Sequence, residues 1–319
     1  MDRATHRVVV GVDGSPGARS ALAWALPEAA RRAAVVEVVT AFPVDVYWLD
    51  PLLLDTRRLE SIRADTERQA RAQVDEVRRD PTVASHPGVV DLDVRVQAVA
   101  APPAPKLVQM SSGADLLVVG SHGHAPVRSA VCGSVALHCA AHAPCPVVVV
   151  HPVPDETEDQ ARIVVGLDDS TPARAALTAA IAHASRTDAR VDAVVAYEQP
   201  RYWTEPYTEI MPSPEESQAR ALSRGQELVA QTVAGSPSDV VRVRAVEGHP
   251  AQVLLRESAG ARLLVVGSRS RNTLQGLALG SVALACVTTA PCPVLVVRLP
   301  PDREERARER TVPAAVVVG

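Results

Sequence analysis

Lysine, aromatic residues and long apolar runs are scarce in this sequence. Lys106 is the only lysine among 33 basic residues, and no motif surrounds it. The G-x4-G-K-[ST] loop of the P-loop nucleotide hydrolases is therefore absent. The apolar runs, residues 147–150 for example, have the length of a strand and fall far short of the roughly 20 residues of a membrane span. Any phosphate binding by lysine would therefore have to use Lys106, which we interpret as a solvated residue at a helix start, and we expect no membrane span.

Charge and cysteine content point to a cytoplasmic protein. The net charge of −4 and the pI of about 6.2 give no electrostatic reason to expect nucleic acid or an anionic membrane as a partner. Five cysteines are an odd number and do not form a disulfide framework. The first residues, MDRATHRVVVGVDGS, contain no signal-peptide pattern. We therefore expect the protein to be located in the cytoplasm.

The sequence repeats itself. VVVGVDGSPGARSAL returns as IVVGLDDSTPARAAL, which pairs Asp13 with Asp168, and ADLLVVGSHG returns as ARLLVVGSRS, which pairs Gly120 with Gly267. A repeat of about 150 residues in a chain of 319 residues indicates a tandem duplication. We predict one domain over residues 1–152, a second over residues 160–300, and a C-terminal tail over residues 301–319.

Each half alternates strand and helix patterns, which is typical of a parallel α/β sheet. In the first half the expected strands cover residues 7–12, 35–41, 91–99, 115–120 and 147–150, and the expected helices cover residues 16–32, 56–80 and 103–112. We predict an α/β fold of two tandem, doubly wound, Rossmann-like domains. Each would have a five-stranded parallel sheet of strand order 3-2-1-4-5 flanked by helices.

A glycine-rich loop follows the fourth strand in each half. In the first half its spacing is Gly120, two residues, Gly123, nine residues, then Gly133-Ser134, just before a helix. Glycines allow close backbone approach, and free N–H groups at a helix start attract an anion. In the second half Ser270 replaces the middle glycine, which would weaken a second anion site. A plain connecting turn is the alternative interpretation.

Asp13 and Asp168 end the first strand of each half, where ligands bind to doubly wound sheets. A carboxylate there can accept hydrogen bonds from a ribose hydroxyl or an exocyclic amine, although a turn-forming aspartate is the simpler interpretation. The spacing Gly11-x2-Gly14-x2-Gly17 does not match the dinucleotide fingerprint, so we interpret Gly14 and Gly17 as turn residues.

Three further groups leave alternatives open. Arg128, in the first glycine loop, could pair with a phosphate or be a solvated charge. The histidines and cysteines between residues 122 and 145 lack the Cys-x2-Cys units of a zinc site, so we interpret the cysteines as small buried hydrophobic residues. The repeated Tyr-Trp pairs at residues 47–48 and 202–203 could belong to the core, an interface or a ligand pocket.

Several motifs together resemble the universal stress protein family. They are DGS after the first strand, PA at the start of the third helix, the glycine loop, and CPVVVV at the end of the unit. The resemblance covers residues 6–150 and 161–298 and is closest to the ATP-binding branch with tandem domains. Ser270 and Ala101 depart from the family pattern; the second half has Gly248 in place of Ala101.

The resemblance implies a set of cofactor-binding residues. Gly11 and Asp13 would face adenine and ribose, and the backbone of Ala41 would meet the base. The phosphates would lie against Gly120, Gly123, Gly133, Ser134 and Val135, with Arg128 nearby. The corresponding residues of the second half are Gly166, Asp168, Ala196, Gly267, Gly280, Ser281 and Val282.

We therefore expect a stress-response or signalling module that binds adenine nucleotide, ATP with Mg²⁺, at the switch point of each half. We assign no catalytic residue and no protein metal ligand. The halves would form a pseudo-dimer within the chain along residues 146–150 and 293–298; a homodimer and an unknown protein partner remain open. The alternatives are a weak ATPase or nucleotide hydrolase, and a protein-interaction scaffold without a ligand.

Overall fold

The computed structural model describes residues 6–42, 56–123, 132–152, 159–199, 212–233, 240–268 and 279–298. The first half contains β1 (Arg7–Val12), α1 (Pro16–Arg31), β2 (Val35–Phe42), α2 (Thr56–Arg79), α3 (Pro81–Ala84), β3 (Val94–Ala100), α4 (Pro103–Met110), β4 (Leu116–Gly120), α5 (Ser134–His142) and β5 (Val147–Val150). The second half contains β6 (Asp159–Gly166), α6 (Thr171–Thr187), β7 (Arg190–Tyr197), α7 (Pro214–Thr232), β8 (Val241–Glu247), α8 (Pro250–Glu257), β9 (Ala261–Gly267), α9 (Ser281–Thr289) and β10 (Val294–Val297).

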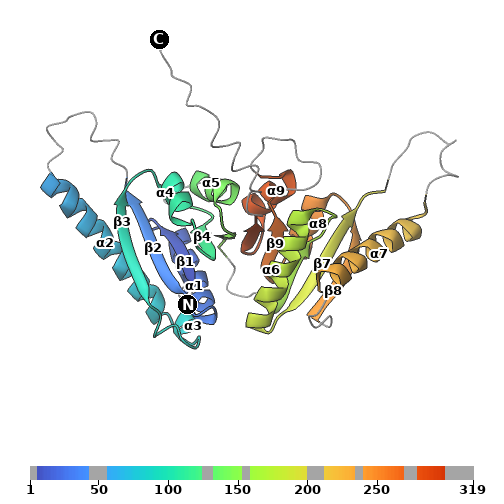
Figure 1. The fold of residues 1–319 in the computed structure, drawn as a ribbon, viewed down its shortest axis with the longest axis horizontal. Coiled ribbons are helices and arrows are strands. Elements are labelled where there is room, and N and C mark those ends of the chain that lie inside the picture. The colour runs from blue at the N-terminus through green and yellow to red at the C-terminus, as the bar shows by residue number, and fades with distance from the viewer. Residues whose placement is uncertain are drawn as a thin grey trace, which may run out of the picture.

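The strands form one ten-stranded sheet of order β3-β2-β1-β4-β5-β10-β9-β6-β7-β8 (Figure 1). Within each half the strands are parallel and follow the predicted order 3-2-1-4-5, mirrored in the second half. The predicted fold is therefore confirmed. The halves join where β5 pairs antiparallel with β10, so the expected pseudo-dimer forms through the final strands.

The pairing of β5 with β10 has the symmetry of a dimer. At its centre Val148 lies opposite Leu295, and these two residues are equivalent in the sequence repeat. The flanking pairs, Val147 with Val296 and Val149 with Val294, exchange equivalent positions. A pseudo-twofold axis therefore passes between Val148 and Leu295, and each half covers the edge strand of the other.

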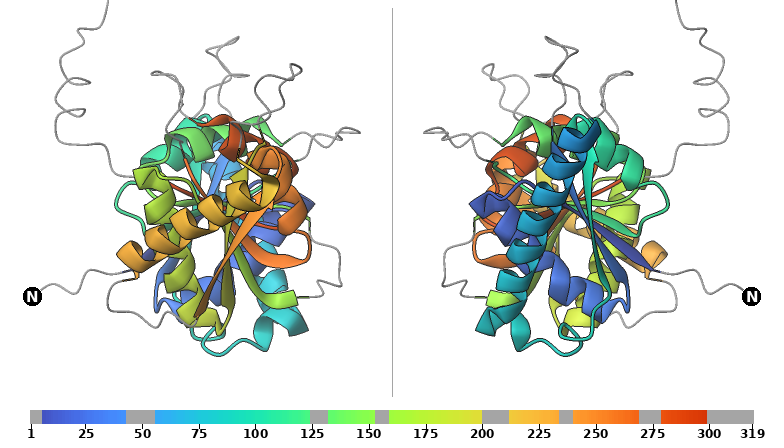
Figure 2. Two further views of the ribbon diagram at one scale, coloured as in Figure 1. Left: turned by 90° about the vertical axis from the view of Figure 1, so that its right-hand side faces the viewer. Right: turned by 90° about the vertical axis from the view of Figure 1, so that its left-hand side faces the viewer.

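Apolar residues form one core layer on each face of the sheet. Val8 and Val10 belong to the layer beneath α1, α2, α6 and α7, while Val9 belongs to the layer beneath α4, α5, α8 and α9. Alternate side chains of a strand point to opposite faces, so a strand covered by helices on both faces is apolar throughout. Figure 2 shows the helices on both sides of the twisted sheet.

Local signals set the ends of the helices. Ser15 caps α1 by accepting a hydrogen bond from the Ala18 N–H at 3.1 Å, and Ser170 caps α6 in the same way from Ala173 at 3.2 Å. Helix α2 ends just before Pro81, as predicted, but Asp80 then caps the short helix α3, which the sequence pattern did not predict.

Strand β3 differs most from its predicted boundaries, whereas β2 and β4 each differ by one residue at one end. Strand β3 begins at Val94 rather than at residue 91, because the Leu92 N–H turns back to the carbonyl of Val89. Strand β6 begins at Asp159, one residue before the start predicted for the second domain. The predicted tail lies outside the described residues. No helix in the ranges given above is long and apolar enough to span a membrane.

The start of α1 is in close contact with the loop after β4. A Cβ atom on Gly17 would lie 2.0 Å from the carbonyl oxygen of His122, and one on Gly120 would lie 2.5 Å from the backbone of Gly17. Gly14 is a turn residue with φ of +85°, as predicted, but the same interpretation is wrong for Gly17, which lies in the first turn of α1. Glycine is needed there because two backbone segments touch.

Replacing Gly17 by alanine should therefore destabilise the protein. In an ordinary helix this change stabilises by about 1 kcal/mol, whereas here the overpacked contact with His122 should cost about 1–3 kcal/mol. Ser20→Ala, on the same helix, is the matched control and should be neutral or stabilising. Thermal unfolding of both variants tests this, and a raised midpoint for Gly17→Ala would contradict the close contact.

Strand β5 should tolerate polar substitution much less than an outer strand. Val148 is fully buried between β4 and β10, whereas Val96 is half-buried on the edge strand β3. Val148→Asn leaves a buried amide without a partner, at a cost of about 1–3 kcal/mol beyond the lost apolar burial. We expect its unfolding midpoint to fall at least twice as far as that of Val96→Asn. Equal shifts would show that the joining of the halves contributes little to stability.

Candidate functional site

A cavity of about 320 Å³ lies at the carboxyl ends of the strands in the first half. Its walls come from the ends of β1, β2 and β4, from α4, and from the start of α5. Every predicted first-half site residue that the structure describes lines it: Gly11, Asp13, Ala41, Gly120, Gly123, Gly133, Ser134 and Val135. Arg128 lies outside the described residues.

One side of this cavity is apolar. Val39, Pro103 and Leu107 line it together with Ala41. A Cβ atom on Gly11 would lie 2.8 Å from the Leu107 side chain, so the glycine leaves room for Leu107 at the end of β1. The face of a flat aromatic group such as a purine base fits a wall of this kind.

Asp13 and Gly123 meet on another side. The Ser15 N–H donates a 2.9 Å hydrogen bond to Asp13 Oδ1, which orients the carboxylate. A Cβ atom on Gly123 would lie 2.7 Å from Asp13 Oδ2. Gly123 does not have a positive φ, so the backbone conformation does not require glycine there. Glycine is required because the Asp13 carboxylate lies so close to the Cα of residue 123. Any side chain on residue 123 would displace Asp13.

The start of α5 completes the cavity with backbone N–H groups. Its N-cap, Gly133, provides no side-chain hydrogen bond to the first turn. The N–H of Gly133 donates to the Ser121 carbonyl at 2.7 Å, and the Ser121 N–H donates to the Val150 carbonyl at 2.8 Å, so the glycine loop is tied to β5. An uncapped helix start carries partial positive charge and binds anions.

The second half repeats this arrangement around a smaller cavity of about 240 Å³. Its lining includes the predicted residues Gly166, Asp168, Ala196, Gly267, Gly280 and Val282, but not Ser281. The Ser170 N–H donates to Asp168 Oδ1 at 3.0 Å, and Gly280 caps α9 without a side-chain hydrogen bond. Ser270, the residue that differs from Gly123, lies outside the described residues.

Several residues that the sequence did not suggest as ligand contacts also line the first cavity. Ser121 is fully buried, and its Oγ lies 2.9 Å from His122 Nδ1. The repeat of Ser121 as Ser268 in the second half was a usable signal. Pro103 and Leu107 could have been found in the same way, because they recur as Pro250 and Leu254.

The five cysteines are buried, as predicted, and their surroundings do not favour a nucleophilic thiolate. Burial raises the pKa of the Cys139 thiol to about 12 and that of the Cys132 thiol to about 11. A thiol with so high a pKa is protonated at neutral pH. Over the described ranges, no group of three or more histidine, cysteine, aspartate or glutamate side chains is placed to hold a metal ion.

Comparison with known proteins shows where this architecture occurs. A universal stress protein of Mycobacterium tuberculosis (strain H37Rv) is 31% identical over 303 residues, covering 93% of this chain and 98% of its own. A universal stress protein of Mycolicibacterium smegmatis is 30% identical over 301 residues, covering 92% of this chain and 97% of its own.

A crystal structure has the same fold over both halves. The universal stress protein of Archaeoglobus fulgidus DSM 4304 superimposes with a TM-score of 0.57 at 16% identity, covering 92% of this chain and 98% of its own. The sequence profile of the universal stress protein family matches residues 4–151 and again residues 161–298. The chain therefore belongs to the universal stress protein family, with two family domains in tandem.

Proposed function

We propose that this protein binds an adenine nucleotide, ATP with Mg²⁺, in the cavity of each half, and that it acts as a cytoplasmic stress-response or signalling module without an enzymatic reaction. One observation carries the proposal. In the first half, a single cavity combines an apolar wall, a carboxylate on Asp13, and the uncapped start of α5.

These three features match the three parts of a nucleotide. The apolar wall around Val39 and Leu107 suits the base, with Ala41 beside it. Asp13, held by the Ser15 N–H, can accept hydrogen bonds from ribose hydroxyls. The N–H groups of Ser134 and Val135 at the start of α5 suit the phosphates.

Magnesium would depend on the nucleotide for most of its ligands. Asp13 is the one carboxylate on the wall of the first cavity over the described ranges. Mg²⁺ keeps several waters and binds through substrate phosphates together with one or two carboxylates. The residues present fit this mode, in which the ion neutralises charge on the bound phosphates.

Slow hydrolysis in the same cavity is the alternative. His122 lines the cavity and contacts Ser121 Oγ, so an imidazole is present that could accept a proton from water. The formation of ADP in the binding assays below would favour this alternative. A scaffold without a ligand would instead retain no nucleotide.

Gly123→Glu should abolish binding in the first cavity. The new side chain would displace Asp13 and add a second carboxylate beside it. Gln226→Glu adds the same charge at an exposed position of α7 in the second half, far from the first cavity, and is the matched control. With labelled ATP at equilibrium, we expect at least a tenfold loss of affinity for Gly123→Glu and none for the control. The proposal fails if the wild type binds no nucleotide or if Gly123→Glu binds equally well.

Two matched variants separate the cavities. Val135 and Val282 occupy equivalent positions in the first turns of α5 and α9, and each lines its own cavity. A glutamate there is compatible with the helix start but competes with phosphates. We expect Val135→Glu to remove most of the tightly bound ATP and Val282→Glu to remove a smaller, weaker fraction. Competition by GTP and by cyclic AMP in the same titration identifies the preferred nucleotide, and equal losses would contradict the expected inequality of the sites.

A further inference from the structure

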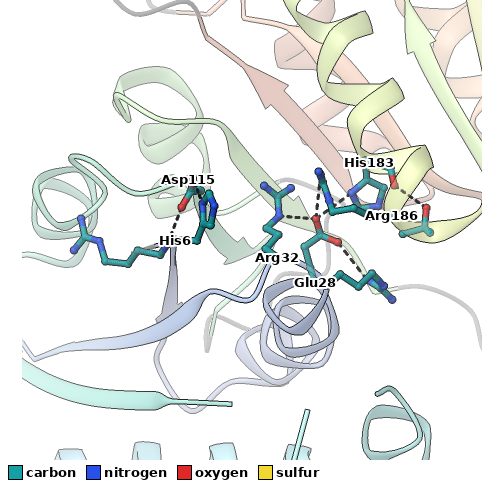
Figure 3. Close-up of polar contacts among 9 residues, drawn as sticks. His6, Glu28, Arg32, Asp115, His183 and Arg186 are labelled. Carbon is teal, nitrogen blue, oxygen red and sulfur yellow. Dashed lines mark hydrogen bonds and ion pairs between the residues drawn. The ribbon is translucent and has the colours of Figure 1, made fainter. Parts of the chain in front are cut away.

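Helices α1 and α6 meet near the pseudo-twofold axis, on the face of the sheet opposite α5 and α9 (Figures 1 and 3). Glu28 of α1 and His183 of α6 face each other there, with Glu28 Oε1 3.2 Å from His183 Nδ1. Both side chains are buried, at 0% and 2% exposure. They are equivalent positions of the sequence repeat, separated by the same interval as Asp13 and Asp168. The duplicated position thus holds an acid in one half and an imidazole in the other.

The surroundings of Glu28 keep it ionised. Arg31 and Arg32 of its own helix lie 3.2 Å and 2.7 Å from its carboxylate, and Arg186 of the second half lies 3.6 Å away. Burial alone would raise the pKa of Glu28, but His183 and Arg32 outweigh it and hold the pKa at about 2. A buried carboxylate in this state is stable only while partners from both halves surround it.

His183 is suited to that carboxylate as a neutral ring. Burial lowers its pKa, and the opposing effect of Glu28 does not restore it. A neutral imidazole can lie 3.2 Å from the Glu28 carboxylate without adding another cation to this interface. This matters because Arg186 and Arg262 already lie near the ring and lower its pKa further.

The two halves also differ in the size of a side chain at this interface. Trp24 of α1 stacks on His183, with ring centroids 6.0 Å apart and planes inclined by 9°. The equivalent residue of α6 is Ala179, and both residues pack against the shared core layer. A large side chain in one half therefore corresponds to a small one in the other.

We propose that Glu28, His183, Trp24 and Ala179 make this interface heterotypic, so that the first half accepts the second half and excludes a second copy of itself. Near a twofold axis equivalent residues face each other. Pairing of two first halves would bury two carboxylates that keep Arg31 and Arg32 but lose His183 and Arg186, and would place two indoles together. Pairing of two second halves would bury two imidazoles beside two copies each of Arg186 and Arg262, with no carboxylate at the position of Glu28, and would leave a void. Discrimination by buried like charges and mismatched sizes is an established route to specific pairing.

Variants of the full chain reproduce the excluded pairings. His183→Glu places glutamate opposite glutamate, as in a pair of first halves, and Glu28→His places histidine opposite histidine. The double variant Glu28→His/His183→Glu restores a complementary pair, and the new carboxylate keeps Arg186 three residues along its helix, as Glu28 has Arg31. We expect each single variant to lower the unfolding midpoint by about 5 °C or more and the double variant to recover at least half of the summed loss.

Controls separate pairing from a general effect of the substitutions. His249→Glu and Glu227→His make the same changes at exposed positions, one at the start of α8 and one on α7, and should shift the midpoint little. Recovery of soluble protein by the double variant is the supporting result if the single variants do not fold. Additive losses, or a double variant as insoluble as the single ones, would overturn the proposal.

The size mismatch is tested independently. Ala179→Trp should lower the midpoint by overpacking and Trp24→Ala by leaving a cavity, whereas Trp24→Ala/Ala179→Trp should be more stable than the sum of the two losses predicts. Size-exclusion chromatography with light scattering should give the wild-type mass for the complementary double variants. A midpoint for the exchanged pair no higher than the additive value would contradict the role of Trp24 and Ala179.

Discussion

The antiparallel pairing of β5 with β10 is the constraint on which the rest of the structure depends. It converts two five-stranded sheets into one sheet and leaves neither final strand with an exposed edge. Because Val148 and Leu295 are equivalent positions, the pairing also creates the pseudo-twofold axis. All other contacts between the halves must then satisfy that symmetry, including the contact of α5 with α9.

The two halves carry different residues at positions that the pseudo-twofold axis brings into contact. Glu28 faces His183, and the residues that follow the final strands bond across to the opposite helices. His151 Nε2 lies 2.9 Å from the carbonyl oxygen of Val287 in α9, while Arg298, its counterpart, donates to the carbonyl of Ala141 in α5. Away from the axis the two halves make equivalent contacts, such as the Ser15–Asp13 and Ser170–Asp168 hydrogen bonds. The different residues at the axis fit an interface that is specific for the other half. The repeated contacts at the cavities fit two sites with the same architecture.

Close backbone packing positions the candidate site. Gly17 brings the start of α1 against the loop after β4, and this places Asp13 beside Gly123. The spacing of the glycines predicted that a loop and a helix start would lie together, since both follow strands of a parallel sheet. The partners of each glycine were not predictable, because Gly17 and His122 are far apart in the chain and only the folded sheet brings them into contact. Ser121 and Leu107 are a different case, because their recurrence as Ser268 and Leu254 was a signal in the sequence.

The sequence by itself determined the duplication, the strand order within each half, the position of the glycine loops and the pairing of the final strands. These follow from periodic apolar patterns, from turn residues and from similarity to a family, all of which are local or repeated features. Only the tertiary structure decided that Glu28 meets His183, that Trp24 stacks across the interface, and that glycine at residue 123 makes room for Asp13. Such contacts join residues far apart in sequence, and no local pattern records which buried charge or ring will lie opposite another.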